Sequence, residues 1–346
     1  MAERRRIAVV LFNLGGPDSL GAVRPFLFNL FKDPAILQLP TPLRQVLAGI
    51  IALARSKTAQ ANYAHMGGAS PLLNETQDQA RALGKALAAR LPDAELKVVI
   101  GMRYWRPTTE AAARAVEAFA PDEVVLLPLY PQFSATTTGS SLKAWRRSYR
   151  GPGRGHTVCC YCEEKGLVEA HVARIQQCWE EAGRPEPVRL LFSAHGLPER
   201  NVLAGDPYQQ QVERTCAAIA SRLEGEWDWQ VCYQSRVGPM KWLGPSTPEA
   251  IQQACRDGKG VLIDPVAFVS EHVETLVELD RDYAELAAQS GCPYYLRART
   301  VGCEPQFIEG LARTVETALA RDGICPEGRR CADAARDCPL EALGKG

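Results

Sequence analysis

The sequence predicts an α/β protein built on parallel sheets in two similar halves. Short runs of Val, Ile and Leu without polar alternation recur along the chain, as expected of strands that are buried on both faces. Amphipathic stretches separate these runs, which implies helical crossovers between parallel strands. Similar turns follow strand runs in the two halves, FNLGGP in the first and FSAHGLP in the second. Helices are therefore expected on both faces of each sheet, with a cleft between the halves.

Each element follows from its own pattern. Uninterrupted apolar runs, of which IAVVLFNL is the first, predict strands at residues 7–14, 96–101, 123–129, 188–194, 229–235, 260–263 and 294–298. Apolar residues at helical spacing predict helices at residues 75–91, 108–120, 166–182, 206–224, 248–257, 271–289 and 305–321. The turn-rich GPGRG at residues 151–155 marks the boundary between a first half, 1–150, and a second half, 156–303. Ligands of open parallel sheets bind at the carboxyl ends of strands, so the loops there are the candidate site.

Composition and charge exclude several classes of protein. The 346 residues include 40 Lys+Arg and 40 Asp+Glu, and this zero net charge gives no reason to expect a nucleic-acid partner. The longest uncharged apolar stretch, residues 45–54, is about half of the roughly 20 residues that a membrane span requires. The basic Arg4–Arg6 and the apolar run after it resemble a signal peptide, but GGPDS follows in place of a cleavage site. A cytoplasmic location is expected.

Two features point to a metal or proton-transfer site. His195 follows a strongly apolar strand and precedes a glycine, which suits a base or a metal ligand, although a lone histidine is as often structural. The predicted helix 271–289 has one apolar face and an opposite acidic stripe, which is also what an ordinary solvated face looks like. The apolar face comprises Val273, Leu276, Val277 and Ala284, and the stripe comprises Glu271, Glu274, Glu278 and Asp282. Together, imidazole and carboxylates would suit Fe(II), Co(II) or Zn(II).

Three loops suggest the kind of ligand. Residues 101–112, 127–141 and 234–251 combine Arg, Tyr, Trp and hydroxyl side chains after predicted strands. Aromatic side chains can lie against a flat apolar ligand, while Arg, Ser and Thr can bind its carboxylates.

The chain resembles the ferrochelatases, which insert Fe(II) into a porphyrin. The resemblance rests on collinear stretches over residues 7–310, among them GMRYWRPTTE, LFSAHGLP, QSRVGPMKWLGP and PVAFVSEHVETLVELD. It implies two Rossmann-like halves of the chelatase type with an active-site cleft between them, and a helix at 304–322 that packs back on the first half. It implies that His195 and Glu274 serve in Fe(II) coordination and proton removal, and that Glu278 continues a carboxylate path. It places Leu14, Arg103, Tyr104, Trp242 and His272 at porphyrin-binding positions.

The expected reaction is insertion of Fe(II), as substrate, into protoporphyrin IX, with loss of two pyrrole protons. Such a reaction needs a base beside the macrocycle. We expect His195, neutral near pH 7, to be the first proton acceptor and Glu274 to be the ligand on the metal side. Coproporphyrin or another divalent metal as substrate, and a non-enzymatic haem or iron carrier, are the alternatives.

The 12 cysteines divide into two groups. Eight are expected to carry no chemistry, and the scattered members Cys178, Cys216, Cys232, Cys255 and Cys292 are interpreted as small buried residues. The extension 323–346 contains Cys325, Cys331 and Cys338, and some ferrochelatases bind a 2Fe–2S cluster through cysteines of such an extension. Ala135 stands where animal members have a cysteine, so Cys303 is the candidate fourth ligand. Thiols without a cluster are the alternative.

The apolar segment 30–43 and the helix after it have two interpretations. They could line the porphyrin entrance and touch a membrane, or they could be an ordinary surface helix.

Overall fold

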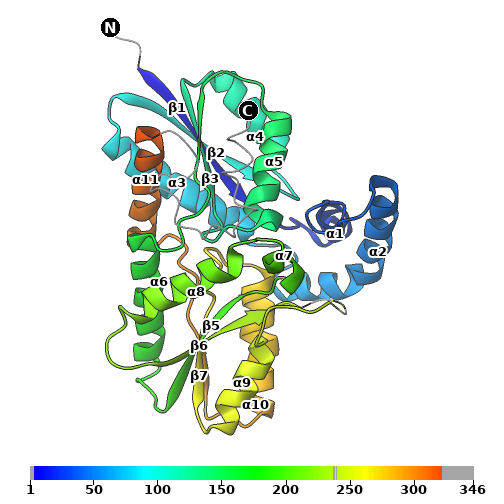
Figure 1. Cartoon of the computed structure of the whole chain (residues 1–346), viewed down its shortest axis with the longest axis vertical. Coiled ribbons are helices and arrows are strands. Elements are labelled where there is room, and N and C mark those ends of the chain that lie inside the picture. Colours follow the sequence, from blue (N-terminus) through cyan, green and yellow to red (C-terminus); the bar gives the residue numbers. More distant parts are fainter. Residues whose placement is uncertain (1–3, 237, 239, 322–346) are drawn as a thin grey trace. The chain divides into compact units, whose positions relative to one another are not determined.

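The computed structural model describes residues 4–236, 238 and 240–321, which form two compact units. Of these residues, unit 1 contains 4–160 and 312–321, and unit 2 contains 161–311. Each unit is built on a four-stranded sheet with helices around it (Figure 1). Within this part of the chain, no helix is long and apolar enough to cross a membrane.

The sheet of unit 1 has the strand order β2-β1-β3-β4, with all neighbours parallel. Its strands are β1 (Arg5–Asn13), β2 (Ala94–Met102), β3 (Glu123–Pro128) and β4 (Arg154–Thr157). Residues 7–12 of β1 are at most 1% exposed, because β1 lies inside the sheet and has both faces covered. The core on one face joins Val10 and Phe12 to Val116 and Trp145.

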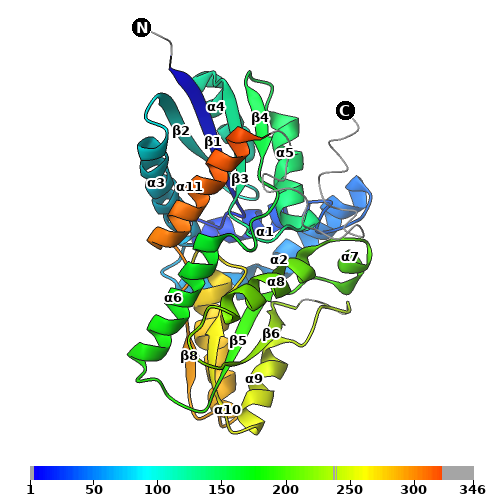
Figure 2. The ribbon, with the colours of Figure 1, turned by 60° about the vertical axis from the view of Figure 1, so that its left-hand side comes forward.

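Helices of unit 1 cover both faces of this sheet, among them α3 (Leu72–Arg90), α4 (Thr109–Phe119) and α5 (Ser140–Ser148). Two others, α1 (Val23–Phe31) and α2 (Thr41–His65), pack against each other beside it (Figure 1). Figures 1 and 2 show α4 and α5 on one side of the sheet and α3 on the other. The last helix, α11 (Pro305–Ala320), starts in unit 2 and ends in unit 1, where Glu316 forms an ion pair with Arg90 of α3 at 2.7 Å.

The sheet of unit 2 repeats the same topology, with the order β6-β5-β7-β8 and all neighbours parallel. Its strands are β5 (Val188–His195), β6 (Asp228–Gln234), β7 (Gly260–Asp264) and β8 (Tyr295–Arg297). Its helices include α6 (Lys165–Glu181), α7 (Glu199–Leu203), α8 (Tyr208–Ala220), α9 (Thr247–Arg256) and α10 (Ala284–Gln289). Leu190 and Phe192 join a core with α6 and α8, whereas Leu191 joins one with α9 and α10. The prediction of two similar α/β halves with parallel sheets and helices on both faces is confirmed.

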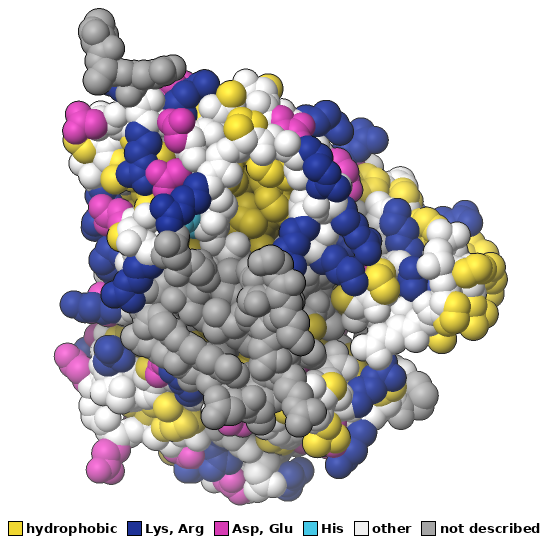
Figure 3. All heavy atoms as spheres, turned by 45° about the horizontal axis from the view of Figure 1, so that its top comes forward, with side chains coloured by type: hydrophobic (Ala, Val, Ile, Leu, Met, Phe, Trp, Pro, Cys, Tyr) yellow, Lys and Arg dark blue, Asp and Glu magenta, His cyan; other side chains and the backbone are white. Residues whose placement is uncertain are grey.

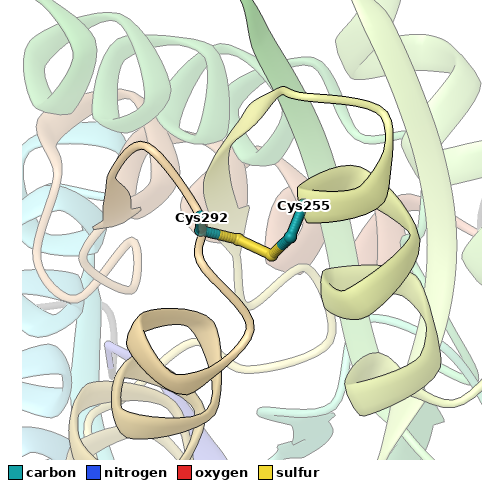
Figure 4. The surroundings of a disulfide bond; sticks show 2 residues. All are labelled: Cys255 and Cys292. Atoms are coloured by element: carbon teal, nitrogen blue, oxygen red, sulfur yellow. A yellow bond between two sulfur atoms is a disulfide. The ribbon is translucent and has the colours of Figure 1, made fainter.

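One expectation about the cysteines is wrong. Cys255, near the end of α9, and Cys292, just after α10, form a disulfide bond, with Cα atoms 4.5 Å apart (Figure 4). The two residues are 37 positions apart in the sequence, and only the packing of α9 beside α10 brings them together. Cys216 and Cys232 are buried and Cys178 is partly buried, as expected.

Candidate active site

His195 is the last residue of β5, at the carboxyl end of the unit 2 sheet. Its Nδ1 lies 2.6 Å from the carbonyl oxygen of Gly196, so Nδ1–H donates and Nε2 points elsewhere. A glycine is required next, because a Cβ at Gly196 would lie 2.7 Å from the carbonyl oxygen of Gln234 and 3.2 Å from the ring of Trp242. His195 Nε2 lies 3.5 Å from Glu274 Oε1, and the imidazole side chain is 42% exposed.

Glu274 begins a π-helix, η3 (Glu274–Tyr283), which continues into α10. A π-helix has i→i+5 hydrogen bonds, is rare, and is common at functional sites. The expected helix is therefore present, but its expected buried face is wrong in part. Of the four predicted apolar positions only Val277 is buried. Thr275, Leu279 and Tyr283 are also buried, because the wider helix changes which residues share a face.

Glu274 lies between two imidazoles. Its Oε2 is 2.5 Å from His272 Nε2, and its Oε1 faces His195. His272 is 7% exposed and is oriented by the carbonyl oxygen of Ser270, which lies 3.0 Å from Nδ1. Burial alone would raise the pKa of Glu274, but the charge of His272 and the hydrogen bonds to both imidazoles hold this pKa well below its usual value. Glu274 is thus a carboxylate anion at neutral pH.

The contact with Glu274 also changes the pKa of His195. Burial alone would lower its pKa, but the hydrogen bond and charge of Glu274, the carbonyl of Gly196 and the charge of Glu278 raise it to about 9. The expectation of a neutral imidazole near pH 7 is therefore wrong for this arrangement. Charge pairing with a carboxylate stabilises the protonated form.

Glu278 is held by four hydrogen-bond donors. Its oxygens accept from the Ser235 amide at 2.8 Å, the Ser235 hydroxyl at 2.5 Å, Gln234 Nε2 at 3.1 Å and the Tyr283 hydroxyl at 2.6 Å. Ser235 has a φ of +62°, a left-handed conformation that is unusual for a residue other than glycine. Glu278 therefore anchors η3 to the end of β6.

Gln234, which the sequence does not single out, connects the end of β6 to Glu274 and Glu278. It is fully buried, and Nε2 also donates to the carbonyl oxygen of Glu274 at 2.9 Å. Its Oε1 accepts from Ser193, which contacts Thr247. The loop 234–251 suggested ligand contacts, and no sequence pattern indicates that its first residue positions the acidic helix.

A second cluster in unit 1 contains Leu14, Arg103 and Tyr104. The Tyr104 amide donates to the carbonyl oxygen of Leu14 at 2.9 Å, and the Arg103 guanidinium carbon lies 5.0 Å from the Tyr104 ring. Arg103 and Tyr104 both contact the buried Asp33, which the sequence did not single out. Trp242 lies in unit 2, where it pairs with Pro198 through backbone and packs against Gly196 beside His195.

The predicted residues thus fall in three places. His195, His272, Glu274 and Glu278 form one site in unit 2, with Trp242 next to it. Leu14, Arg103 and Tyr104 form a cluster in unit 1. Cys303 is exposed in unit 2, and Cys325, Cys331 and Cys338 lie outside the described residues. Within the described residues, no group of three or more His, Cys, Asp or Glu side chains could hold a metal ion.

A family model and curated relatives identify one family, and a solved structure shares the fold. The family model described as Ferrochelatase matches residues 6–319. The chain is 60% identical over 323 residues to a protein named ferrochelatase from Phenylobacterium zucineum, covering 93% of this chain and 94% of that one. It is 58% identical over 340 residues to a ferrochelatase of Caulobacter vibrioides, covering 97% of both. A solved structure of the sirohydrochlorin chelatase SirB from Bacillus subtilis in complex with cobalt has a similar fold, with a TM-score of 0.51, 11% identity, and coverage of 91% and 96%.

Proposed function

Since the chain belongs to the ferrochelatase family, we propose that it inserts Fe(II) into protoporphyrin IX to form protohaem, with release of two protons, in haem biosynthesis. The observation that carries this proposal is the Glu274 carboxylate facing the His195 imidazole. Metal insertion into a free-base porphyrin needs a metal ligand and a proton acceptor at one place. A binding protein would need no proton acceptor.

We assign Glu274 to the metal side and His195 to the first pyrrole proton. An anionic carboxylate is a suitable ligand for Fe(II), and the low pKa of Glu274 keeps it anionic. Without iron, the charge of Glu274 favours the imidazolium form of His195, which has no free acceptor. A cation at Glu274 would offset that charge, so that the Nε2 proton passes to solvent, to which the side chain is 42% exposed. The neutral imidazole can then accept a pyrrole proton through Nε2, because Nδ1–H donates to the carbonyl of Gly196. Each pyrrole N–H bond that breaks leaves its electron pair on nitrogen for the iron. His272 and Glu278 hold Glu274 and its helix in place.

The porphyrin carboxylates are assigned to the unit 1 cluster. Arg103 supplies a guanidinium suited to a carboxylate, and Leu14 and Tyr104 supply apolar and aromatic surface for the macrocycle. Trp242 beside His195 offers a second aromatic surface.

An anaerobic assay with Fe(II) tests the function. Purified protein is mixed with protoporphyrin IX or with coproporphyrin, and loss of free-base fluorescence is followed with formation of the haem spectrum. Catalysed insertion, fastest with protoporphyrin IX, is expected. Faster insertion with coproporphyrin would reassign the substrate. Binding of porphyrin and iron without acceleration would make the protein a carrier and overturn the proposal.

We also propose a cytoplasmic location with peripheral contact to an anionic membrane. One face of α2 exposes Leu43, Val46, Ile50 and Leu53, each between 55% and 62% exposed. Figure 3 shows hydrophobic side chains gathered at the right, with Lys and Arg side chains beside them. Asp33 is the sole acidic residue between Ser19 and Asn74, and it is buried. An apolar helix face bordered by positive charge suits an anionic lipid surface.

A 2Fe–2S cluster is proposed at Cys303 with Cys325, Cys331 and Cys338. Cys303 precedes α11 and is exposed, and thiolates are the usual ligands of such clusters. When bound, the cluster would add redox-active iron outside the insertion site. Protein prepared anaerobically should show visible absorption and acid-labile sulfide, and Cys303→Ser should remove both. Absence of both from the wild type would overturn this assignment.

A further inference from the structure

Asp33 is a buried carboxylate outside the His195–Glu274 site. It lies between α1 and α2 and is 4% exposed. A carboxylate in such a position costs free energy unless hydrogen bonds and a counter-charge compensate for lost hydration. Its contacts therefore indicate what it holds in place.

Both oxygens of the Asp33 carboxylate accept hydrogen bonds. Its Oδ2 accepts from Arg103 Nη2 at 2.6 Å, the Tyr104 hydroxyl at 2.9 Å and the Ser140 hydroxyl at 2.5 Å. Its Oδ1 accepts from the Ala35 amide at 2.9 Å. Two carboxylate oxygens offer about four acceptor sites. One side chain thus joins the α1–α2 connection to the segment after β2 and to the start of α5.

The Arg103 guanidinium donates hydrogen bonds from one edge, through Nε and Nη2. Its Nη2 donates to Asp33, and its Nε donates to Ser140 Oγ at 2.6 Å. Its Nη1 has no hydrogen-bond partner among the residues that the structure describes, and the side chain is 23% exposed. A guanidinium has five N–H donors in a fixed plane, so fixing two of them sets the direction of the rest.

The Tyr104 hydroxyl is the hydrogen-bond donor in its contact with Asp33. Burial, and then the charge of Asp33, raise its pKa well above the usual value, so the hydroxyl keeps its proton. Asn29 Nδ2 donates to the Tyr104 carbonyl oxygen at 3.1 Å, so α1 itself is also linked to this segment.

We propose that Asp33 is a positioning residue that directs the Arg103 guanidinium towards a carboxylate substituent of the porphyrin and fixes the α1–α2 connection beside it. This inference rests on the proposed function, because it assumes that Arg103 binds the porphyrin. The competing account is that Asp33 only stabilises the α1–α2 connection. The two accounts differ in whether the effect of Asp33 passes through Arg103.

A double-mutant cycle separates the two accounts. The dissociation constant of protoporphyrin IX is measured by fluorescence, without iron, for the wild type, Asp33→Ala, Arg103→Ala and the double variant. Asp33→Ala and Arg103→Ala are each expected to weaken binding about tenfold, the usual effect of losing a charge-assisted hydrogen bond. In the Arg103→Ala background, Asp33→Ala should change the dissociation constant less than about twofold, because coupled residues are not additive.

Two further variants keep the test decisive. Asp33→Asn replaces Asp33→Ala if the latter does not fold, since it keeps the size of the side chain and removes only its charge. Glu316→Gln breaks the Arg90–Glu316 ion pair, which has a similar length of 2.7 Å and lies in the same unit. This control should leave porphyrin binding unchanged.

Three results with the Asp33 and Glu316 variants would overturn the inference. They are unchanged binding in Asp33→Ala or Asp33→Asn, equal weakening by the Asp33 substitution in both backgrounds, and weakening by Glu316→Gln to the same extent. Failure of the wild type to bind porphyrin would instead contradict the proposed function. Unchanged binding in Arg103→Ala would remove the assumption on which the inference rests and so contradict it too.

Discussion

His195 and Glu274 come together at the carboxyl end of the unit 2 sheet, with Nε2 of the imidazole 3.5 Å from Oε1 of the carboxylate. One residue ends a strand and the other begins a π-helix, so the fold itself determines their distance. The charge of His272, with hydrogen bonds to both imidazoles, keeps Glu274 anionic, and Glu274 in turn raises the pKa of His195. Each of these electrostatic effects can be measured separately from turnover.

The pKa of His195 should fall when Glu274 loses its charge. The wild-type imidazole should titrate with a pKa of about 9. Glu274→Gln should lower this pKa, because it removes the carboxylate whose hydrogen bond and charge do most to raise it. Proton NMR of the histidine ring, with His195→Gln to identify the signal, measures both values. A wild-type pKa near the ordinary value of about 6.5 would contradict the described pair.

The free energy of unfolding should depend on pH in the direction that the raised pKa of His195 requires. A histidine with a raised pKa stabilises the folded state fully below its unfolded pKa, and this contribution is lost as pH rises through the folded pKa. The free energy of unfolding should therefore fall between about pH 6.5 and about pH 9. Denaturant unfolding at several pH values should give a smaller slope for Glu274→Gln. An equal slope in both proteins would show that this pair does not cause the dependence.

Removing the charge of Glu278 should destabilise unit 2. In the wild type, four hydrogen-bond donors point at the Glu278 carboxylate, and Glu278→Gln would place an NH₂ group against some of them. We therefore expect the free energy of unfolding to fall by about 2–3 kcal/mol. Turnover should also fall. Tyr283→Phe is the matched control, since it removes only one donor and should cost about 1 kcal/mol. The account fails if Tyr283→Phe costs as much as Glu278→Gln.

The disulfide between Cys255 and Cys292 should stabilise the oxidised protein. A cross-link over 37 residues restricts the unfolded chain, which is worth about 3–4 kcal/mol. Cys255→Ser should lower the melting temperature without reductant, and added dithiothreitol should then have no further effect. Cys178→Ser is the control, because burial raises the pKa of the Cys178 thiol to about 11 and it takes no part in the bond. Two free thiols at these positions, by mass spectrometry of the oxidised protein, would contradict the bond.

Charge on the exposed face of α2 should weaken membrane binding. Ile50→Asp places a carboxylate where an apolar side chain is 59% exposed, and sedimentation with vesicles containing anionic lipid should show at least about tenfold weaker binding. Leu203→Asp is the control, since Leu203 is 85% exposed and belongs to unit 2, not to α2. Equal loss in both variants, or no binding by the wild type, would contradict the membrane contact.

Much of the fold could be predicted, because its strands are apolar runs. The expected strand 188–194 matches β5 to within a residue, and the expected helix 248–257 matches α9 as closely. The sequence does not predict the bounds of helix α2, because the buried residues of this helix are mostly small. Ala48, Ala52 and Ser56 face inward while larger apolar residues face outward, which gives no ordinary amphipathic pattern.

The site could be predicted only in part. The position of His195 and the spacing of the acidic stripe indicate candidate site residues. The resemblance of the chain to a known family predicts that His195 and Glu274 act together. The π-helical turn, the role of Gln234 and the left-handed Ser235 depend on contacts between elements that are distant in sequence. Asp33 was missed for the same reason, since its partners lie in three separate segments.

The most direct test of the central claim is anaerobic Fe(II) insertion by His195→Ala. If His195 accepts the first pyrrole proton, turnover should fall at least about 100-fold, the usual contribution of a general base, while the dissociation constant of protoporphyrin IX stays within about threefold of the wild type. His65→Ala, at the exposed end of α2, should retain full activity. Wild-type turnover by His195→Ala would contradict the assignment.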